Sequence, residues 1–137
     1  MENLQIKLNY KNGMTLYVMN EPEMFNNFIE LLPKNSVRKV ISPNDKVEFI
    51  IVFATAKADL EKMVQVFVPL LEGDAIVWIS YPKGTSKKYK CDFNRDTSGE
   101  ILSPYNMLPV RQISIDEDWS TLRFRKVEFI KSITRKF

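Results

Sequence analysis

The chain has 137 residues, of which 45% are hydrophobic and 27% are charged, as is usual for one domain with its own core. Its formal charge of +3 is lower than that of most dedicated nucleic-acid binders. It contains no histidine and one cysteine, Cys91. These counts exclude Ser-His-Asp catalysis, imidazole zinc sites and an internal disulfide. We therefore expect Cys91 to pack in the interior, and we expect no cofactor and no metal site.

No apolar run approaches the about 20 residues that a bilayer demands. The first residues alternate polar and apolar types, without the basic and then apolar segments of a signal peptide. We expect a cytoplasmic protein that does not enter a membrane. Residues 1–137 are expected to form a single α/β domain, with 130–137 as a mobile basic tail.

The first predicted elements are a strand over 14–19 and a helix that follows it. Asn20 or Glu21 would cap this helix, and Pro33 would end it. Its buried face follows the i, i+3, i+4, i+7 spacing of an amphipathic helix: Phe25, Phe28, Ile29 and Leu32.

Two further strands are predicted over 37–41 and 47–54. The second is an almost continuous run of Ile, Val and Phe, which is typical of a central strand covered on both faces. The link between the two strands is short for a parallel crossover, which normally takes a dozen or more residues. The strand order around 36–47 is therefore left open.

A second helix is predicted to start at a Thr55 cap, to kink or end at Pro69 and to be closed by Gly73. Its apolar stripe contains Leu60, Met63, Val64, Phe67 and Leu71. A buried strand over 75–81 follows, so 47–81 is predicted to form a β-α-β unit with a right-handed crossover.

The rest of the chain is predicted to contain a basic loop over 82–90 and an irregular helix around 98–105. Strands over 110–115 and 120–129 would then form an antiparallel hairpin around a turn at 116–118. The expected fold class is α/β with three layers. A small, mixed and mostly parallel sheet would carry helices on both faces and end in the C-terminal antiparallel hairpin.

Ligands of open α/β sheets gather beyond the carboxyl ends of the strands, which points to 20–22, 55–57 and 81–90. The third segment brings together ammonium, hydroxyl and backbone donors that suit an anion. The candidate anion-binding residues are Lys83, Thr85, Ser86, Lys87 and Lys88. The Walker order is absent, and a solvated surface loop is the favoured alternative. The glycine-rich turn of dinucleotide-binding proteins is also absent after the first strand.

The three carboxylates of Asp116, Glu117 and Asp118 could hold a hard cation, but a plain polar turn is the favoured interpretation. Trp119 beside them is expected to lie in the core. The carboxyl end reads either as an amphipathic docking segment or as a frayed strand end. It contains the basic residues Lys126, Lys131, Arg135 and Lys136, interleaved with Phe129, Ile130, Ile133 and Phe137.

Several segments together resemble a bacterial family that is described only as a domain of unknown function. Its two distinctive signatures are Trp-Ile-Ser-Tyr-Pro-Lys at 78–83 and Asp-x-x-Trp-Ser-x-Leu-x-Phe at 116–124. The resemblance extends over about 10–127 and includes 20–22, 31–33, 49–53 and Ser86. It implies a small α/β protein with the outline of a shortened, glycine-poor methyltransferase sheet. The sequence departs from the family over 91–109, where the smooth arginine-bearing helix of other members is not expected.

Three functions are compatible with these sequence features. The first is a non-catalytic module that binds a protein partner or a small anionic ligand at Lys83 to Lys90, and it is the favoured one. The second is a reduced methyltransferase-like or nucleotide-using enzyme, with Lys83 and Ser86 steadying the ligand and Asp116 or Asp118 as base. The third is weak nucleic-acid binding through the basic loop and tail, which the modest charge disfavours.

Overall fold

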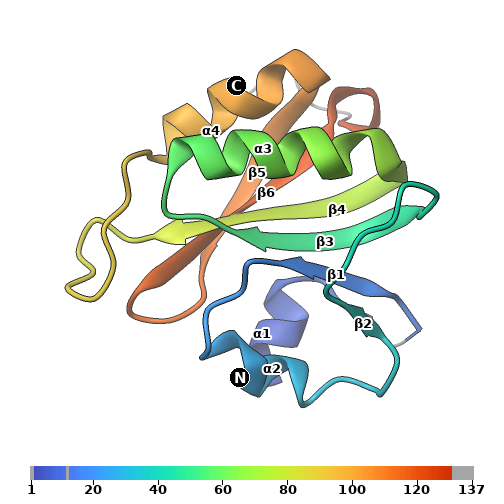
Figure 1. The fold of residues 1–137 in the computed structure, drawn as a ribbon, viewed down its shortest axis with the longest axis horizontal. Helices are drawn as coiled ribbons and strands as arrows, with labels where there is room; N and C mark the ends of the chain where they lie inside the picture. The colour runs from blue at the N-terminus through green and yellow to red at the C-terminus, as the bar shows by residue number, and fades with distance from the viewer. Residues whose placement is uncertain (1, 12, 131–137) are drawn as a thin grey trace.

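The fold is built on one six-stranded mixed sheet, seen in the computed structural model, which describes residues 2–11 and 13–130 (Figure 1). The strand order is β2-β1-β3-β4-β6-β5. Strands β1 to β4 run parallel to one another, and β6 is antiparallel to both β4 and β5. The mixed α/β sheet with a C-terminal antiparallel pair confirms the expected fold class.

The strands are β1 (Leu16–Met19), β2 (Val37–Arg38), β3 (Val47–Phe53), β4 (Leu71–Pro82), β5 (Met107–Ser114) and β6 (Trp119–Lys126). The α-helices are α1 (Glu2–Lys7), α2 (Phe25–Ile29), α3 (Lys57–Phe67) and α4 (Arg95–Leu102). Single 3₁₀ turns form η1 (Val68–Leu70), η2 (Ser103–Tyr105) and η3 (Val127–Phe129).

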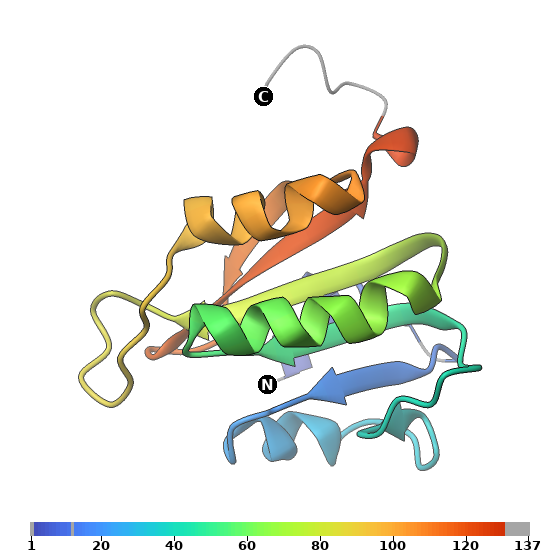
Figure 2. The same cartoon turned by 45° about the horizontal axis from the view of Figure 1, so that its top comes forward.

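Helices cover both faces of the sheet, which gives the three layers that were expected (Figure 2). Alternate residues of β3 serve the two cores, because successive strand residues point to opposite faces. Ile50 and Val52 pack with α3 and α4, whereas Phe49 and Ile51 pack with α1 and α2. No helix among the described residues is long and apolar enough to cross a membrane.

Several elements differ from those expected. Helix α1 was not among the predicted elements, and α2 begins only at Phe25. Helix α4 forms over Arg95–Leu102 with Asn94 as its N-cap, so the segment is more regular than expected and does carry an arginine. Gly73 does not close a helix, because it lies inside β4 with φ +56° where β4 shifts register against β3.

The short link from β2 to β3 crosses over β1. Strand β2 lies on one side of β1 and β3 on the other. Strand β2 has only two residues, and both Arg38 and Ile50 pair with the same β1 residue, Tyr17. After β2 the chain therefore has to run back only about as far as Val47 to begin β3. A helix is therefore not needed in this crossover. The predicted basic residues at 131–137 lie outside the described residues.

Candidate functional site

The topology creates a switch point between β1 and β3. After β1 the chain turns to one side of the sheet to form β2, and it then returns to build β3 and β4 on the other side. In open α/β sheets, ligands bind outside the carboxyl ends of the strands at such a point. The residues that follow β1 and β3 are therefore the candidates for ligand binding.

Asn20 joins the carboxyl ends of β1 and β3. Its backbone is left-handed, with φ 60°, a conformation that asparagine tolerates better than most residues. Its side-chain Nδ2 donates to the carbonyl oxygen of Phe53 at 2.9 Å. The prediction that Asn20 caps a helix is wrong, because α2 starts at Phe25 with Met24 as N-cap and no side-chain cap bond.

An ion pair lies across the carboxyl ends of β1 and β2. Lys39 Nζ lies 2.9 Å from the Glu21 carboxylate and also donates to Asn26 Oδ1 at 2.9 Å. In dinucleotide-binding folds, a glycine turn and an acidic residue about 20 positions later hold the pyrophosphate and ribose here. This chain places Glu21 and Lys39 at the corresponding positions, and they bind each other.

A crevice opens at the switch point, between the end of β1 and helix α3. It has a volume of about 430 Å³ and is lined by Met19, Asn20, Asp59, Lys62 and Met63. Two thioethers thus lie beside an amide, a carboxylate and an ammonium group. Sequence reasoning singled out Asn20 but missed the others, because only the strand order brings α3 next to the end of β1.

The predicted basic loop is folded onto the β5–β6 turn. Ser86 Oγ donates to Asp118 Oδ1 at 2.8 Å and accepts from the backbone N–H groups of Lys88 and Tyr89 at 3.2 and 3.1 Å. Lys83 Nζ donates to Ser114 Oγ at 2.7 Å. Ser86 therefore organises the loop, with a carboxylate already beside it.

The other predicted anion-binding residues, Thr85, Lys87 and Lys88, are exposed. Lys88 lies over the ring of Tyr89, 5.6 Å from its centroid. The loop thus does not gather its candidates around one point, and their role in anion binding stays a prediction.

The carboxylate of Asp116 stabilises the turn at 116–118. Asp116 Oδ1 accepts from the backbone N–H groups of Asp118 and Trp119, both at 2.8 Å. Trp119 is buried, as expected, and packs edge-on against Phe53 with ring centroids 5.3 Å apart. No group of metal-ligating residues occurs within 2–11 and 13–130.

A cavity of about 480 Å³ lies beneath the basic loop and is lined by residues that include Tyr81, Lys83, Ser86, Lys90 and Cys91. Burial raises the pKa of the Cys91 thiol, and burial likewise raises the pKa of Tyr81. Both groups therefore stay protonated at neutral pH, which makes Cys91 a poor nucleophile.

The loop is also tied to helix α3. Asp92 Oδ1 accepts from the backbone N–H of Lys57 at 2.6 Å, and the Asp92 N–H donates to the Thr55 carbonyl at 3.2 Å. The predicted Thr55 cap is wrong, because Ala56 is the N-cap residue and makes no side-chain cap bond. The carboxylate of Asp92 takes over that function from a distant part of the chain.

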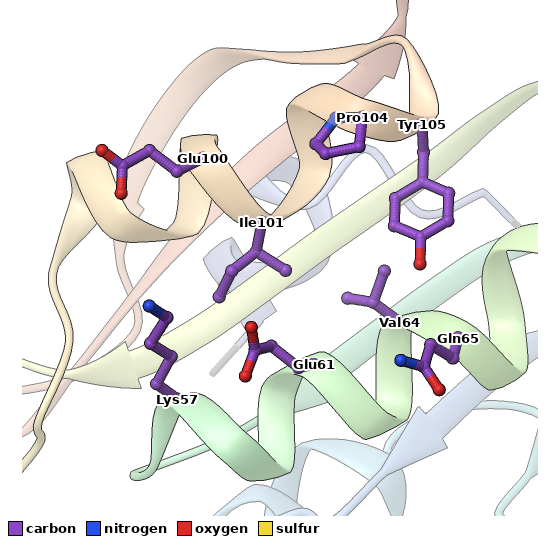
Figure 3. A pocket seen from close by; sticks show the side chains of 8 residues that line it. All are labelled: Lys57, Glu61, Val64, Gln65, Glu100, Ile101, Pro104 and Tyr105. Atoms are coloured by element: carbon purple, nitrogen blue, oxygen red, sulfur yellow. The ribbon is translucent and has the colours of Figure 1, made fainter.

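A third hollow, of about 270 Å³, runs between α3 and α4 (Figure 3). Lys57, Glu61 and Gln65 line it from α3, and Glu100 and Tyr105 line it from the opposite side. It is a groove between two packed helices, away from the switch point. Because ligands of such sheets bind at the switch point, this groove is a weaker candidate for a ligand site than the crevice.

No protein-family model and no curated protein matches the sequence. Solved structures do match the fold. A SAM-dependent methyltransferase from Aquifex aeolicus superposes with a TM-score of 0.62 at 14% identity, over 90% of this chain and 88% of that chain. ChlM, the magnesium protoporphyrin IX methyltransferase of Synechocystis PCC 6803, matches with a TM-score of 0.60 at 8% identity, over 90% of this chain and 79% of that one.

The N-methyltransferase NodS from Bradyrhizobium japonicum WM9 gives a TM-score of 0.58 at 13% identity, over 91% of this chain and 92% of that chain. The chain spans only 39% of the length of LepI, another match, at a TM-score of 0.54 and 10% identity. Identities this low establish the fold alone. The chain therefore has a Rossmann-like α/β fold of the kind found in SAM-dependent methyltransferases.

Proposed function

We propose that the chain is a methyltransferase-like protein that binds a small adenosyl ligand in the crevice at the switch point. The observation that carries the proposal is the position of this crevice, which opens where the strand order reverses and beside the carboxyl end of β1. The fold shared with SAM-dependent methyltransferases supports the same choice.

The crevice offers complementary chemistry for such a ligand. Asn20 Nδ2 is bound to Phe53, which leaves Oδ1 of this exposed residue as an acceptor for the exocyclic amine of an adenine. The Asp59 carboxylate can accept from ribose hydroxyls, and the Lys62 ammonium can donate to an amino-acid carboxylate. Met19 and Met63 provide adaptable apolar contacts.

The ion pair of Glu21 and Lys39 favours binding on the β3 side of β1, where the crevice lies. The rim between β1 and β2 is occupied by that pair, so a ligand held in the glycine-turn manner would have to break it. Among the described residues, the carboxylate that lines the crevice is that of Asp59. The proposal therefore concerns binding first, with Asp59 as the base if a methyl group is transferred.

Calorimetry and thermal unfolding with SAM and with S-adenosylhomocysteine test the proposal. Ligand at a hundredfold excess over Kd should stabilise the folded state by about 2.7 kcal/mol, which raises Tm by several degrees. Asp59→Asn and Lys62→Gln should each weaken binding about tenfold or more, because each removes a charged hydrogen bond. Glu61→Gln, on the same helix but facing the α3–α4 groove, is the matched control and should bind normally.

Absence of heat and of any Tm shift with both ligands at millimolar concentration would refute the proposal. Equal weakening in the Glu61→Gln control would also count against it, because the effect would then come from the charge of α3 and not from the crevice.

A second candidate function is the binding of a small anion by a non-catalytic module. The cavity beneath the basic loop, with Lys83 and Lys90 in its lining, favours it. The Asp118 carboxylate bound to Ser86 opposes it, because like charges repel. Titration with phosphate should move the backbone amide signals of Gly84 and Thr85 if this function is correct, and unchanged signals would dismiss it.

A further inference from the structure

Two arginines face each other on the sheet surface opposite α3 and α4. Arg111 of β5 and Arg123 of β6 are register partners, so their side chains leave the same face of the sheet. Trp78 of β4 is the other register partner of Arg123 and belongs to the core beneath α1 and α2. The arginine pair therefore lies on the face opposite the crevice.

A β-bulge creates this pairing. Pro109 pairs with Phe124 and Arg111 pairs with Arg123, so Val110 is an extra residue on β5. Bulges re-aim side chains, and here the bulge places Arg111 directly opposite Arg123 in the register. Like charges placed directly opposite each other on a sheet are destabilising. The arrangement therefore costs stability unless something neutralises it.

Asp74, the carboxylate whose charge acts on Arg123, is already paired with another arginine. Asp74 binds Arg125 through a two-pronged contact, with Arg125 Nε donating to Oδ1 at 2.9 Å and Nη2 donating to Oδ2 at 2.6 Å. Within 2–11 and 13–130, the ion pairs join Arg125 to Asp74 and Lys39 to Glu21, so neither Arg111 nor Arg123 has an acidic partner there.

Arg123 also carries an unsatisfied donor. Its Nε is buried and makes no hydrogen bond within the described residues. Burial lowers the pKa of Arg123, and the charges of Arg125 and Arg111 lower it further, whereas the Asp74 carboxylate raises it. A buried donor of this kind costs free energy until an acceptor reaches it.

We propose that Arg111 and Arg123 together bind the phosphate group of a small phosphorylated ligand. A carboxylate has two oxygens and satisfies one guanidinium fork, as Asp74 does for Arg125. A phosphate group has the additional oxygens and the second negative charge that two facing forks require. Its charge also removes the repulsion between the two arginines across the strands.

The site is tested with inorganic phosphate, followed through the Arg123 Nε–Hε signal by ¹⁵N NMR at constant ionic strength. The signal should shift saturably with phosphate and much less with acetate. Arg111→Gln should weaken phosphate binding about tenfold or more, because a charged hydrogen-bonding partner is lost. Arg123→Lys should weaken it similarly, because the charge remains but the fork is lost.

Arg38→Gln is the matched control, since Arg38 is an exposed arginine of β2 at the far edge of the sheet, and its phosphate affinity should stay unchanged. An Arg123 signal that phosphate does not move would overturn the proposal. So would an equal response to acetate, or an Arg111→Gln variant that binds phosphate normally. Asp59→Asn leaves this face untouched, so failure of the adenosyl proposal and failure of this one are separable.

Discussion

Asn20 should contribute to stability in two separable ways, through its left-handed backbone and through its bond to Phe53. Replacement by alanine removes the hydrogen bond, with a net cost of about 1 kcal/mol. It also places a residue less suited to φ 60° at this position, which costs about 1 kcal/mol more. We expect Asn20→Ala to lower the free energy of unfolding by about 2 kcal/mol and Asn20→Gly by about 1 kcal/mol, because glycine tolerates the conformation.

Asn35 provides the control for this prediction. It has a similar φ of 68° and is exposed, and its side chain makes no hydrogen bond within the part of the chain that the structure describes. Asn35→Ala should therefore cost only the backbone contribution of about 1 kcal/mol, and Asn35→Gly should be close to neutral.

Urea unfolding followed by circular dichroism measures all four variants. The difference between the two sites reports the bond to Phe53, and the difference between alanine and glycine at one site reports the backbone contribution. If Asn20→Gly is as stable as the unmodified protein, the bond across the switch point contributes nothing and the reasoning fails.

Asp92→Ala should cost about 1 kcal/mol in the same assay, because it removes the acceptor of the first N–H of α3; Asp92→Asn, which keeps an acceptor oxygen, should recover most of that loss. Ser80→Ala should destabilise by about 1 to 3 kcal/mol by orphaning the buried hydroxyl of Thr121, and a double variant with Thr121→Val should be more stable than the single one. The Arg125 contact lowers the pKa of Asp74. The Asp74–Arg125 pair therefore adds to the free energy of unfolding above the unfolded pKa of about 3.9, and this stabilisation disappears as pH falls through the folded pKa. The stability difference between the protein and Asp74→Asn should accordingly be present at neutral pH and vanish in strong acid; a difference that persists there would contradict the assigned cause.

The central unit of the fold could be predicted from sequence because its signals are local and strong. The apolar run at 47–54 and the helical stripe that includes Leu60 and Val64 specify β3 and α3 without reference to the rest of the chain. Helix α1 was missed because six residues give too short a pattern to identify. The predicted cap at Asn20 is wrong because its side chain donates to the carbonyl oxygen of Phe53 instead. The predicted cap at Thr55 is wrong because Asp92 supplies the acceptor for the first N–H of α3.

The candidate sites depend on features that no local pattern carries. The crevice requires β1 to lie between β2 and β3, and the sequence left the strand order around 36–47 open. The arginine pair requires the bulge at Val110, which sets the register of β5 on β6. The basic loop was visible in the sequence, but the contact of Ser86 with Asp118, which anchors it, joins residues 32 positions apart.

The place of β6 between β4 and β5 also governs how the chain can be assembled. During synthesis β5 emerges before β6, yet it has no strand to pair with until β6 has docked on β4. Until Trp119–Lys126 arrives, the long edge of β4 presents unpaired backbone groups beside apolar side chains such as Val77 and Ile79. Such an edge is a template for pairing with other chains. Nascent chains stalled before β6 are therefore the species that should depend most on chaperones.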